Sequence, residues 1–123
     1  SAPIFMQNTL TPRDTVDRYL AAQLTTRTAN TDANDLLYQI DASRTYDPSK
    51  GLERIIAPVM FINSADDFIN PPELGIAERD IKRVKRGRFV LIPASAETRG
   101  HGTHTWAALW KQYLVELLAS SAR

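Results

Sequence analysis

Two short apolar runs in the second half of the chain constrain its fold more than any other feature. The segments APVMFIN (57–63) and RFVLIP (88–93) are bounded by Pro, Gly or polar residues, which is typical of strands buried on both faces. A helical pattern lies between the two runs, and a second helical pattern follows them. The order strand, helix, strand, helix predicts an α/β fold with parallel strands joined by a right-handed crossover.

The helix between the predicted strands has start and stop signals. Asn70 suits the capping position, Pro71 suits the first helical position, and Gly87 favours the end of the helix. A row of apolar residues marks the closing helix, and we expect its aromatic members to belong to the core: Trp106, Leu109, Trp110, Tyr113, Leu114, Leu117 and Leu118. Because two strands cannot cover such a row, we expect the chain to be an incomplete part of a larger α/β domain.

The first part of the chain has a helical pattern throughout. Thr11 and Pro12 suit the cap and the first position of one helix, and a second helix is expected to open at NTDAND. Turn-forming Pro and Gly residues follow it. The sequence therefore predicts a helical lid or cap segment over residues 1–50 and the C-terminal part of an α/β core over residues 51–123.

Composition excludes several classes of function. The chain has 123 residues, of which 43% are apolar and 24% charged, and a formal net charge of +1. This balance gives no electrostatic argument for nucleic acid, and the basic run RDIKRVKRGR is interleaved with Glu78 and Asp80, which favours a solvated helix face. No apolar run approaches the roughly 20 residues of a membrane helix. Without cysteine there is neither a disulfide framework nor thiolate chemistry, and the compartment stays open.

Candidate catalytic residues follow each predicted strand. Asp66 and Asp67 come after the first strand, and His101 comes after the second. Because catalytic groups gather at the carboxyl ends of parallel strands, we expect a carboxylate and the imidazole to converge there. A carboxylate paired with imidazole fixes the tautomer of the ring and stabilises the imidazolium that forms during proton transfer. The sequence therefore predicts a general base oriented by an acid.

Asp67 is the predicted acid because of its spacing to the following Pro, whereas Asp66 is predicted to bond the backbone of its own turn. His104 is expected to hydrogen-bond locally in the first turn of the closing helix. His101 and His104 have the spacing of a metal-binding pair, but no third ligand is evident, and neither metal nor cofactor is expected. The non-catalytic interpretation of His101 is a loop residue that caps the last helix.

The order of these residues resembles the C-terminal half of an α/β-hydrolase. In that superfamily the triad runs nucleophile, acid, histidine, and Asp67 followed by His101 matches the last two members. The segment DANDLLYQIDASRTYDPS (32–49) is similar to the lid of the homoserine O-acetyltransferase-like family. INSADDFINPPE and GHGTHTW occupy that family's acid and histidine positions.

Two departures limit what the resemblance implies. Gly102 follows the histidine where the acetyltransferases typically have Asp, which argues against homoserine as the acceptor. No Gly-x-Ser-x-Gly elbow occurs in the 123 residues, so the nucleophile and the oxyanion-hole amides are expected from a missing N-terminal half. Ser1 as a terminal nucleophile is disfavoured because no strand pattern begins there.

The resemblance implies an enzyme part that is inactive alone. Its expected substrates are a small acyl ester or acetyl-CoA and an alcohol acceptor, with helices in residues 11–46 as the lid. We expect a homodimer or an assembly with the missing half, because a two-stranded sheet leaves apolar surface open. The alternative from another class is a non-catalytic α/β module that binds a partner chain.

Overall fold

The computed structural model describes residues 4, 6, 7, 10 and 13–121, which fall into two compact units. Residues 49–121 form one unit together with residues 4, 6 and 7, and residues 10 and 13–48 form the other. The division after Pro48 is close to the predicted boundary at residue 50, although the described residues nearest the N-terminus group with the core unit. Ser1, Thr11 and Pro12, on which predictions were made, lie outside the described residues.

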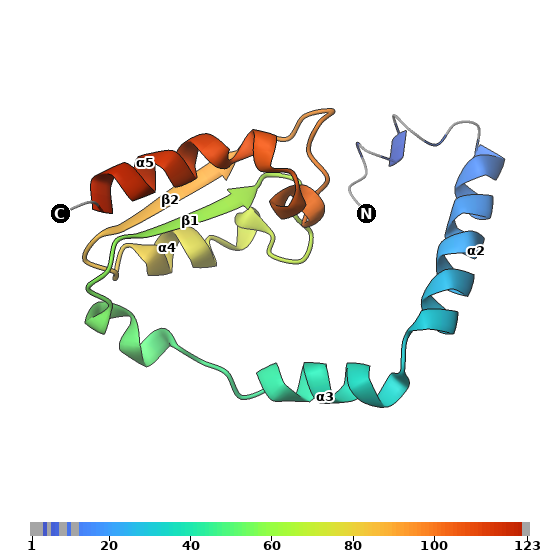
Figure 1. The fold of residues 1–123 in the computed structure, drawn as a ribbon, viewed down its shortest axis with the longest axis horizontal. Helices are drawn as coiled ribbons and strands as arrows, with labels where there is room; N and C mark the ends of the chain where they lie inside the picture. Colours follow the sequence, from blue (N-terminus) through green and yellow to red (C-terminus); the bar gives the residue numbers. More distant parts are fainter. Residues whose placement is uncertain (1–3, 5, 8–9, 11–12, 122–123) are drawn as a thin grey trace. The chain divides into compact units, whose positions relative to one another are not determined.

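The helical unit contains α2 (Arg13–Asn30) and α3 (Ala33–Ser43) (Figure 1). Asp32 is the N-cap of α3, and its Oδ1 accepts hydrogen bonds from the backbone N–H groups of Asn34 at 2.8 Å and Asp35 at 3.2 Å. These bonds satisfy donors that the first turn of a helix leaves without an intrahelical partner. The predicted opening of a second helix at NTDAND is confirmed. No residue of α3 is buried.

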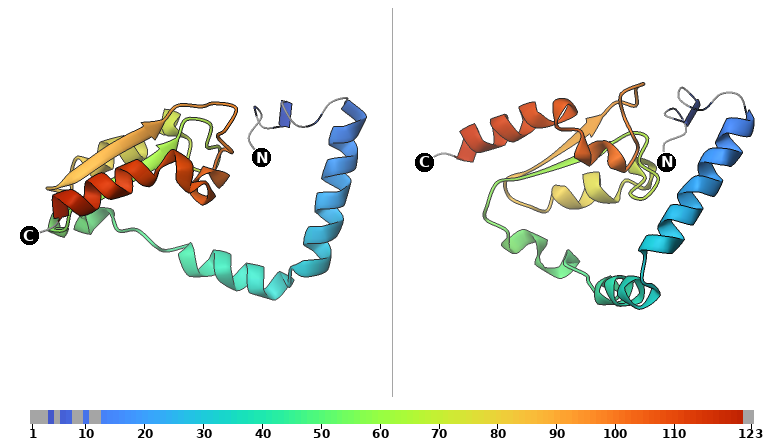
Figure 2. Two further views of the ribbon diagram at one scale, coloured as in Figure 1. Left: turned by 45° about the horizontal axis from the view of Figure 1, so that its top comes forward. Right: turned by 45° about the vertical axis from the view of Figure 1, so that its right-hand side comes forward.

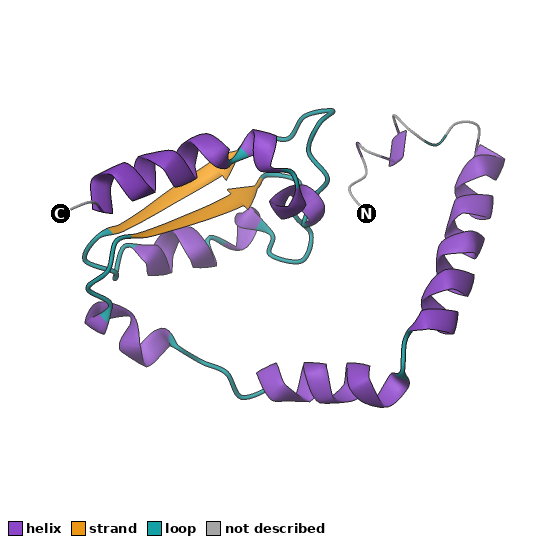
Figure 3. Ribbon diagram, viewed as in Figure 1, coloured by secondary structure: helices purple, strands orange, loops and turns teal. Residues whose placement is uncertain are grey.

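The core unit is a two-stranded parallel sheet with helices on both sides. Its elements are η1 (Ser49–Arg54), β1 (Val59–Ser64), η2 (Pro72–Leu74), α4 (Ile76–Ile81), β2 (Gly87–Ile92), η3 (Gly102–Thr105), η4 (Ala107–Leu109) and α5 (Lys111–Ser121). The helices α4 and α5 lie on opposite faces of the sheet (Figures 1 and 2). Both strands lie within two residues of their predicted limits and run in parallel, so the coarse α/β class is confirmed (Figure 3).

The register brings the two strand ends together. Phe61 is opposite Phe89, with ring centroids 6.1 Å apart, and Ser64 at the end of β1 is opposite Ile92 at the end of β2. The N–H of Ala65 extends the ladder by one bond to the carbonyl of Ile92 at 2.9 Å. The loops that follow the two strands therefore leave the same edge of the sheet side by side.

The segment after β1 departs from the single helix that the sequence predicts. Pro71 is the N-cap of η2 rather than the first residue of a long helix, and Asn70 does not cap it. Gly75 has a φ of 63°, a left-handed conformation that interrupts the helical ladder and separates η2 from α4. The helix α4 then ends at Ile81, well before the predicted stop at Gly87.

The closing segment also begins differently. Two short 3₁₀ turns precede α5, which starts at Lys111, so Trp106 lies before the helix rather than within it. Trp106 is exposed, with the guanidinium of Arg99 at 4.0 Å from its ring centroid, while Trp110 and Tyr113 are half-buried. The prediction that all three aromatic residues are core is therefore wrong, because two strands offer too little area to cover them.

The core of this unit is small. Its buried apolar residues come from α4, from the turn after it and from β2: Ile81, Val84, Val90 and Ile92. Phe61 of β1 and Leu91 of β2 remain exposed, so the strands are not buried on both faces as predicted. The six-residue α4 cannot cover its face of the sheet. Among the described residues, no helix combines the length and apolarity needed to cross a membrane.

Candidate active site

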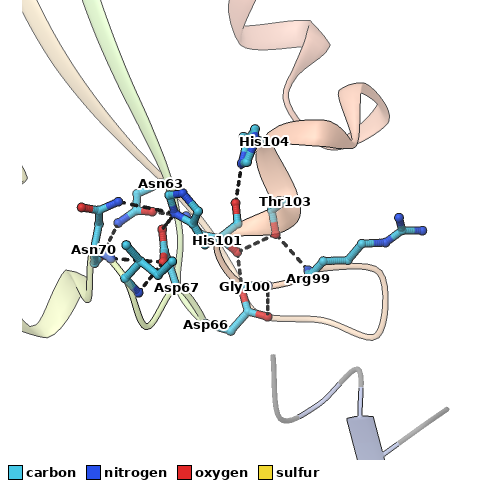
Figure 4. A network of polar contacts seen from close by, with 11 residues as sticks. Asn63, Asp66, Asp67, Asn70, Arg99, Gly100, His101, Thr103 and His104 are labelled. Atoms are coloured by element: carbon cyan, nitrogen blue, oxygen red, sulfur yellow. Dashed lines mark hydrogen bonds and ion pairs between the residues drawn. The ribbon is translucent and has the colours of Figure 1, made fainter. Parts of the chain in front are cut away.

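Asp67 and His101 form a hydrogen-bonded pair across the two loops that leave the sheet. Asp67 Oδ2 lies 3.1 Å from His101 Nδ1 (Figure 4). The two residues are 34 positions apart in the sequence, and the shared edge of the parallel strands brings them together. The predicted convergence of this carboxylate and this imidazole is therefore confirmed.

The second oxygen of Asp67 holds the carboxylate in its own loop. Asp67 Oδ1 accepts hydrogen bonds from the backbone N–H groups of Ile69 at 2.8 Å and Asn70 at 3.1 Å. This is the local turn that Asp side chains commonly form. One oxygen thus anchors the carboxylate, while the other is directed to the ring of His101.

The environment of Asp67 favours its ionised form. Burial by itself raises the pKa of the Asp67 carboxyl group, but hydrogen bonds from His101 and from the N–H groups of Asn70 and Ile69, with the charge of the imidazole, hold the pKa below its ordinary value. An ionised carboxylate can only accept, so the hydrogen of the close contact belongs to His101 Nδ1. In the neutral ring, Nε2 then carries the free lone pair that a general base needs.

The two partners differ in exposure. The Asp67 side chain is 5% exposed and the His101 side chain 45%. A cavity of about 400 Å³ lies at this edge of the sheet, and both residues line it. Phe61, Ile62 and Trp110 add apolar walls. The pair therefore consists of a buried carboxylate in contact with an accessible imidazole beside an open volume, an arrangement that general-base chemistry can use.

His104 has the local role that was predicted for it. Its Nδ1 contacts the carbonyl oxygen of His101 at 2.5 Å, and the two rings are 5.2 Å apart between centroids. His101 is the N-cap residue of η3, but its side chain makes no capping hydrogen bond. In the part of the chain that the structure describes, no three His, Asp or Glu side chains group as metal ligands.

Asp66 has partners that the sequence did not reveal. Its Oδ1 accepts from the hydroxyl of Ser64, and its Oδ2 accepts from the hydroxyl of Thr98 at 2.9 Å and from the N–H of Gly100 at 3.0 Å. The prediction of a residue that serves its own turn therefore misses the main contacts of Asp66, which cross to the loop after β2. The one available signal was the presence of hydroxyl residues nearby, Ser64 at the end of β1 and Thr98 in the loop after β2.

Two asparagines were also missed. Asn63 Nδ2 donates to the carbonyl of Asn70 at 2.7 Å, and Asn63 Oδ1 accepts from the N–H of Ser64 at 2.8 Å. Asn70 Nδ2 lies 3.5 Å from His101 Nδ1. The bond from Asn63 to Asn70 joins the two ends of the loop that carries Asp67. The side chain of Asn70 also lies next to the His101 ring.

Comparison with known proteins adds no relative: no protein-family model, no curated protein and no solved structure matches the chain. The described part of the chain has a mixed helix and sheet fold with two parallel strands and an Asp–His pair at their carboxyl ends.

Proposed function

We propose that this chain is the C-terminal segment of a serine-nucleophile enzyme of the α/β-hydrolase type, which cleaves esters or transfers an acyl group to an alcohol. It supplies the acid and the histidine, as the resemblance to the homoserine O-acetyltransferase-like family implies. The observation that carries this proposal is the 3.1 Å contact between buried Asp67 and the accessible ring of His101 beside a cavity.

The chemistry assigned to the pair is general-base catalysis. His101 Nε2 takes the proton of a serine hydroxyl supplied by the missing half, while the serine oxygen bonds to the acyl carbon of the substrate. His101 then returns this proton to the leaving alcohol or thiol as its bond to the acyl carbon breaks. Water or an alcohol releases the acyl group in a second round of the same transfers. Asp67 stabilises the imidazolium in both rounds.

The cavity walls suggest a small acyl substrate. Phe61, Ile62 and Trp110 provide apolar surface for an acyl chain next to His101. A small ester or acetyl-CoA would serve as the donor, and water or an alcohol as the acceptor. Gly102 removes the carboxylate that the acetyltransferases typically have after the histidine, so we expect a broader acceptor range than homoserine.

A second function is favoured by a different observation. Three large apolar side chains on α5 are exposed, Leu114 at 40%, Val115 at 57% and Leu118 at 61%. Such a surface fits a non-catalytic module that binds a partner chain. On that interpretation the Asp67–His101 contact is structural, and no partner would produce turnover.

The test is to produce the chain together with a candidate N-terminal half that carries a serine elbow, starting with the polypeptide encoded directly upstream. Hydrolysis of p-nitrophenyl acetate should appear only in the assembly. His101→Ala should abolish it, and Asp67→Asn should lower kcat by roughly 10⁴, because the amide no longer holds the productive tautomer. Equal activity in both variants and the wild type would reject the assignment.

Asp80→Asn is the matched control, because Asp80 is an acidic residue of α4 whose partner is the neighbouring Arg79. It should retain the activity of the wild type. Failure of every candidate half to restore turnover, combined with tight binding to another protein, would favour the non-catalytic module.

A further inference from the structure

Asp66 lies beside the proposed catalytic pair, yet the reaction gives it no task. Its relative exposure is 7%, and both of its oxygens accept hydrogen bonds. Figure 4 shows its carboxylate below the loop that carries His101, with Gly100 on one side and Thr103 nearby. A buried carboxylate is costly unless it is well paired, so its partners indicate what it is for.

One set of partners forms a chain of donors with a fixed direction. The N–H of Arg99 donates to Thr103 Oγ1 at 2.9 Å, the hydroxyl of Thr103 donates to Ser64 Oγ at 3.4 Å, and the hydroxyl of Ser64 donates to Asp66 Oδ1. Each hydroxyl has one hydrogen, and an ionised carboxylate only accepts. The chain therefore runs from the backbone of Arg99 to Asp66.

The second set of partners reaches Asp66 Oδ2 directly. The N–H of Gly100 donates to it at 3.0 Å, and the hydroxyl of Thr98 lies 2.9 Å away. Thr98 Oγ1 is also 2.9 Å from the carbonyl of Ser95, so its single hydrogen is shared between two acceptors. Thr98 is fully buried, so its hydroxyl is shielded from bulk water.

These partners lie on both sides of one residue. Residues 98 to 100 precede His101 and Thr103 follows it, so a single carboxylate restrains the backbone before and after the imidazole. We propose that Asp66 is a positioning residue: by accepting hydrogen bonds, directly or through Ser64, from residues 98–100 and 103, it holds the His101 ring at hydrogen-bond distance from Asp67.

The charge of Asp66 is consistent with this role. Burial by itself raises the pKa of the Asp66 carboxyl group, but hydrogen bonds from Ser64, Thr98 and the N–H of Gly100 bring the pKa below its ordinary value. Asp66 is therefore ionised at neutral pH. The amide of asparagine has the same shape but places an NH₂ donor where one oxygen accepts. The backbone N–H of Gly100 is fixed in direction, so it would face this NH₂ group without an acceptor. The Ser64 hydroxyl could rotate to accept from the NH₂ group, but it would then no longer donate to residue 66.

The experiment measures the tautomer of the His101 ring by ¹⁵N NMR on the 123-residue chain at a pH where the ring is neutral. His104→Gln assigns the two ring systems. The wild type should hold His101 mainly as the Nδ1–H form that Asp67 accepts. In Asp66→Asn the ratio of Nδ1–H to Nε2–H forms should fall by about tenfold, as expected from the loss of one hydrogen bond to a charged group.

Two further variants keep the test decisive. Thr98→Val conserves volume and removes one donor to Asp66, so it should shift the ratio in the same direction but less. Asp80→Asn should leave the ratio unchanged. A ratio equal to that of the wild type in folded Asp66→Asn, even with a lowered urea midpoint, shows a merely structural role and overturns the proposal. If Asp66→Asn does not fold, an unchanged ratio in Thr98→Val has the same consequence.

The turnover part of this inference rests on the proposed function, but the tautomer part does not. In an active assembly, Asp66→Asn should lower kcat by roughly 10² with little change in KM, because misplacement of the base affects the chemical step more than binding. A tautomer shift in Asp66→Asn, combined with no turnover in any assembly of the wild-type chain, would support the positioning role and reject the enzyme. An unchanged tautomer ratio in Asp66→Asn, combined with turnover in the wild-type assembly, would support the enzyme and reject the positioning role.

Discussion

Asp66 and Asp67 are neighbours in the sequence, but their carboxylates bind different parts of the loop after β2. Asp67 accepts from the ring of His101, and Asp66 accepts from the N–H of Gly100 and the hydroxyl of Thr98. The carboxylate that contacts the His101 ring and the carboxylate that bonds the backbone before His101 thus lie on one loop. Each charge has its own donors, which allows two adjacent carboxylates to be buried together.

Acid should destabilise the core unit through this pair of carboxylates. The pKa values of Asp66 and Asp67 are lowered in the folded chain. Their contribution is therefore complete above the ordinary Asp pKa and is lost as the pH falls through the lower folded value, below about pH 4. Urea unfolding at several pH values should show the free energy of unfolding falling in this range. Asp66→Asn should flatten the fall, whereas an identical acid slope in both proteins would contradict this.

Gly87→Ala should weaken the contact between α4 and β2. A Cβ at position 87 would lie 3.0 Å from the Cβ of Val84 and closer still to the carbonyl oxygen of Ile81. Overpacking of this kind costs about 1–3 kcal/mol. Gly51→Ala is the control, because its Cβ would meet nothing within 4 Å, and the free energy of unfolding should stay the same or rise slightly. Equal urea midpoints for the two variants would show that the contact relaxes without cost.

Asp32→Ala should shorten or fray α3. The lost Oδ1 leaves the N–H groups of Asn34 and Asp35 without their cap, at a cost of about 1 kcal/mol. Amide exchange at these two positions should accelerate. Asp41→Ala, which removes only an exposed ion pair with Arg44, should have a much smaller effect. Equal exchange rates in the two variants would argue against the cap.

The exposed side of α5 should control self-association. Replacing Val115 and Leu118 by Lys removes two exposed apolar side chains, so sedimentation should shift towards the monomer. Gln112→Lys adds a charge at an exposed position of the same helix and should change the sedimentation little. A wild-type chain that is a compact monomer at every concentration would show that this surface needs no partner.

Parts of this structure follow from local sequence and others do not. The strands β1 and β2 and the start of α3 within NTDAND were predictable because apolar runs and helix-start residues act within a few positions. The break at Gly75 was not, because a helix with an internal left-handed Gly has the same start signals as an unbroken one. The exposure of Trp106 was not predictable either, since burial depends on how much sheet is present to cover it.

By itself the sequence predicted that two parallel strands would place an acid and a histidine at one edge, because the apolar runs and the polar residues that follow them are local features of the chain. The spacing to Pro71 favoured Asp67 as the acid, but only the tertiary structure decided which groups pair with Asp66. Asp66 and Asp67 are the same residue type one position apart, and their roles differ because hydroxyl and N–H donors more than 30 residues away select one of them.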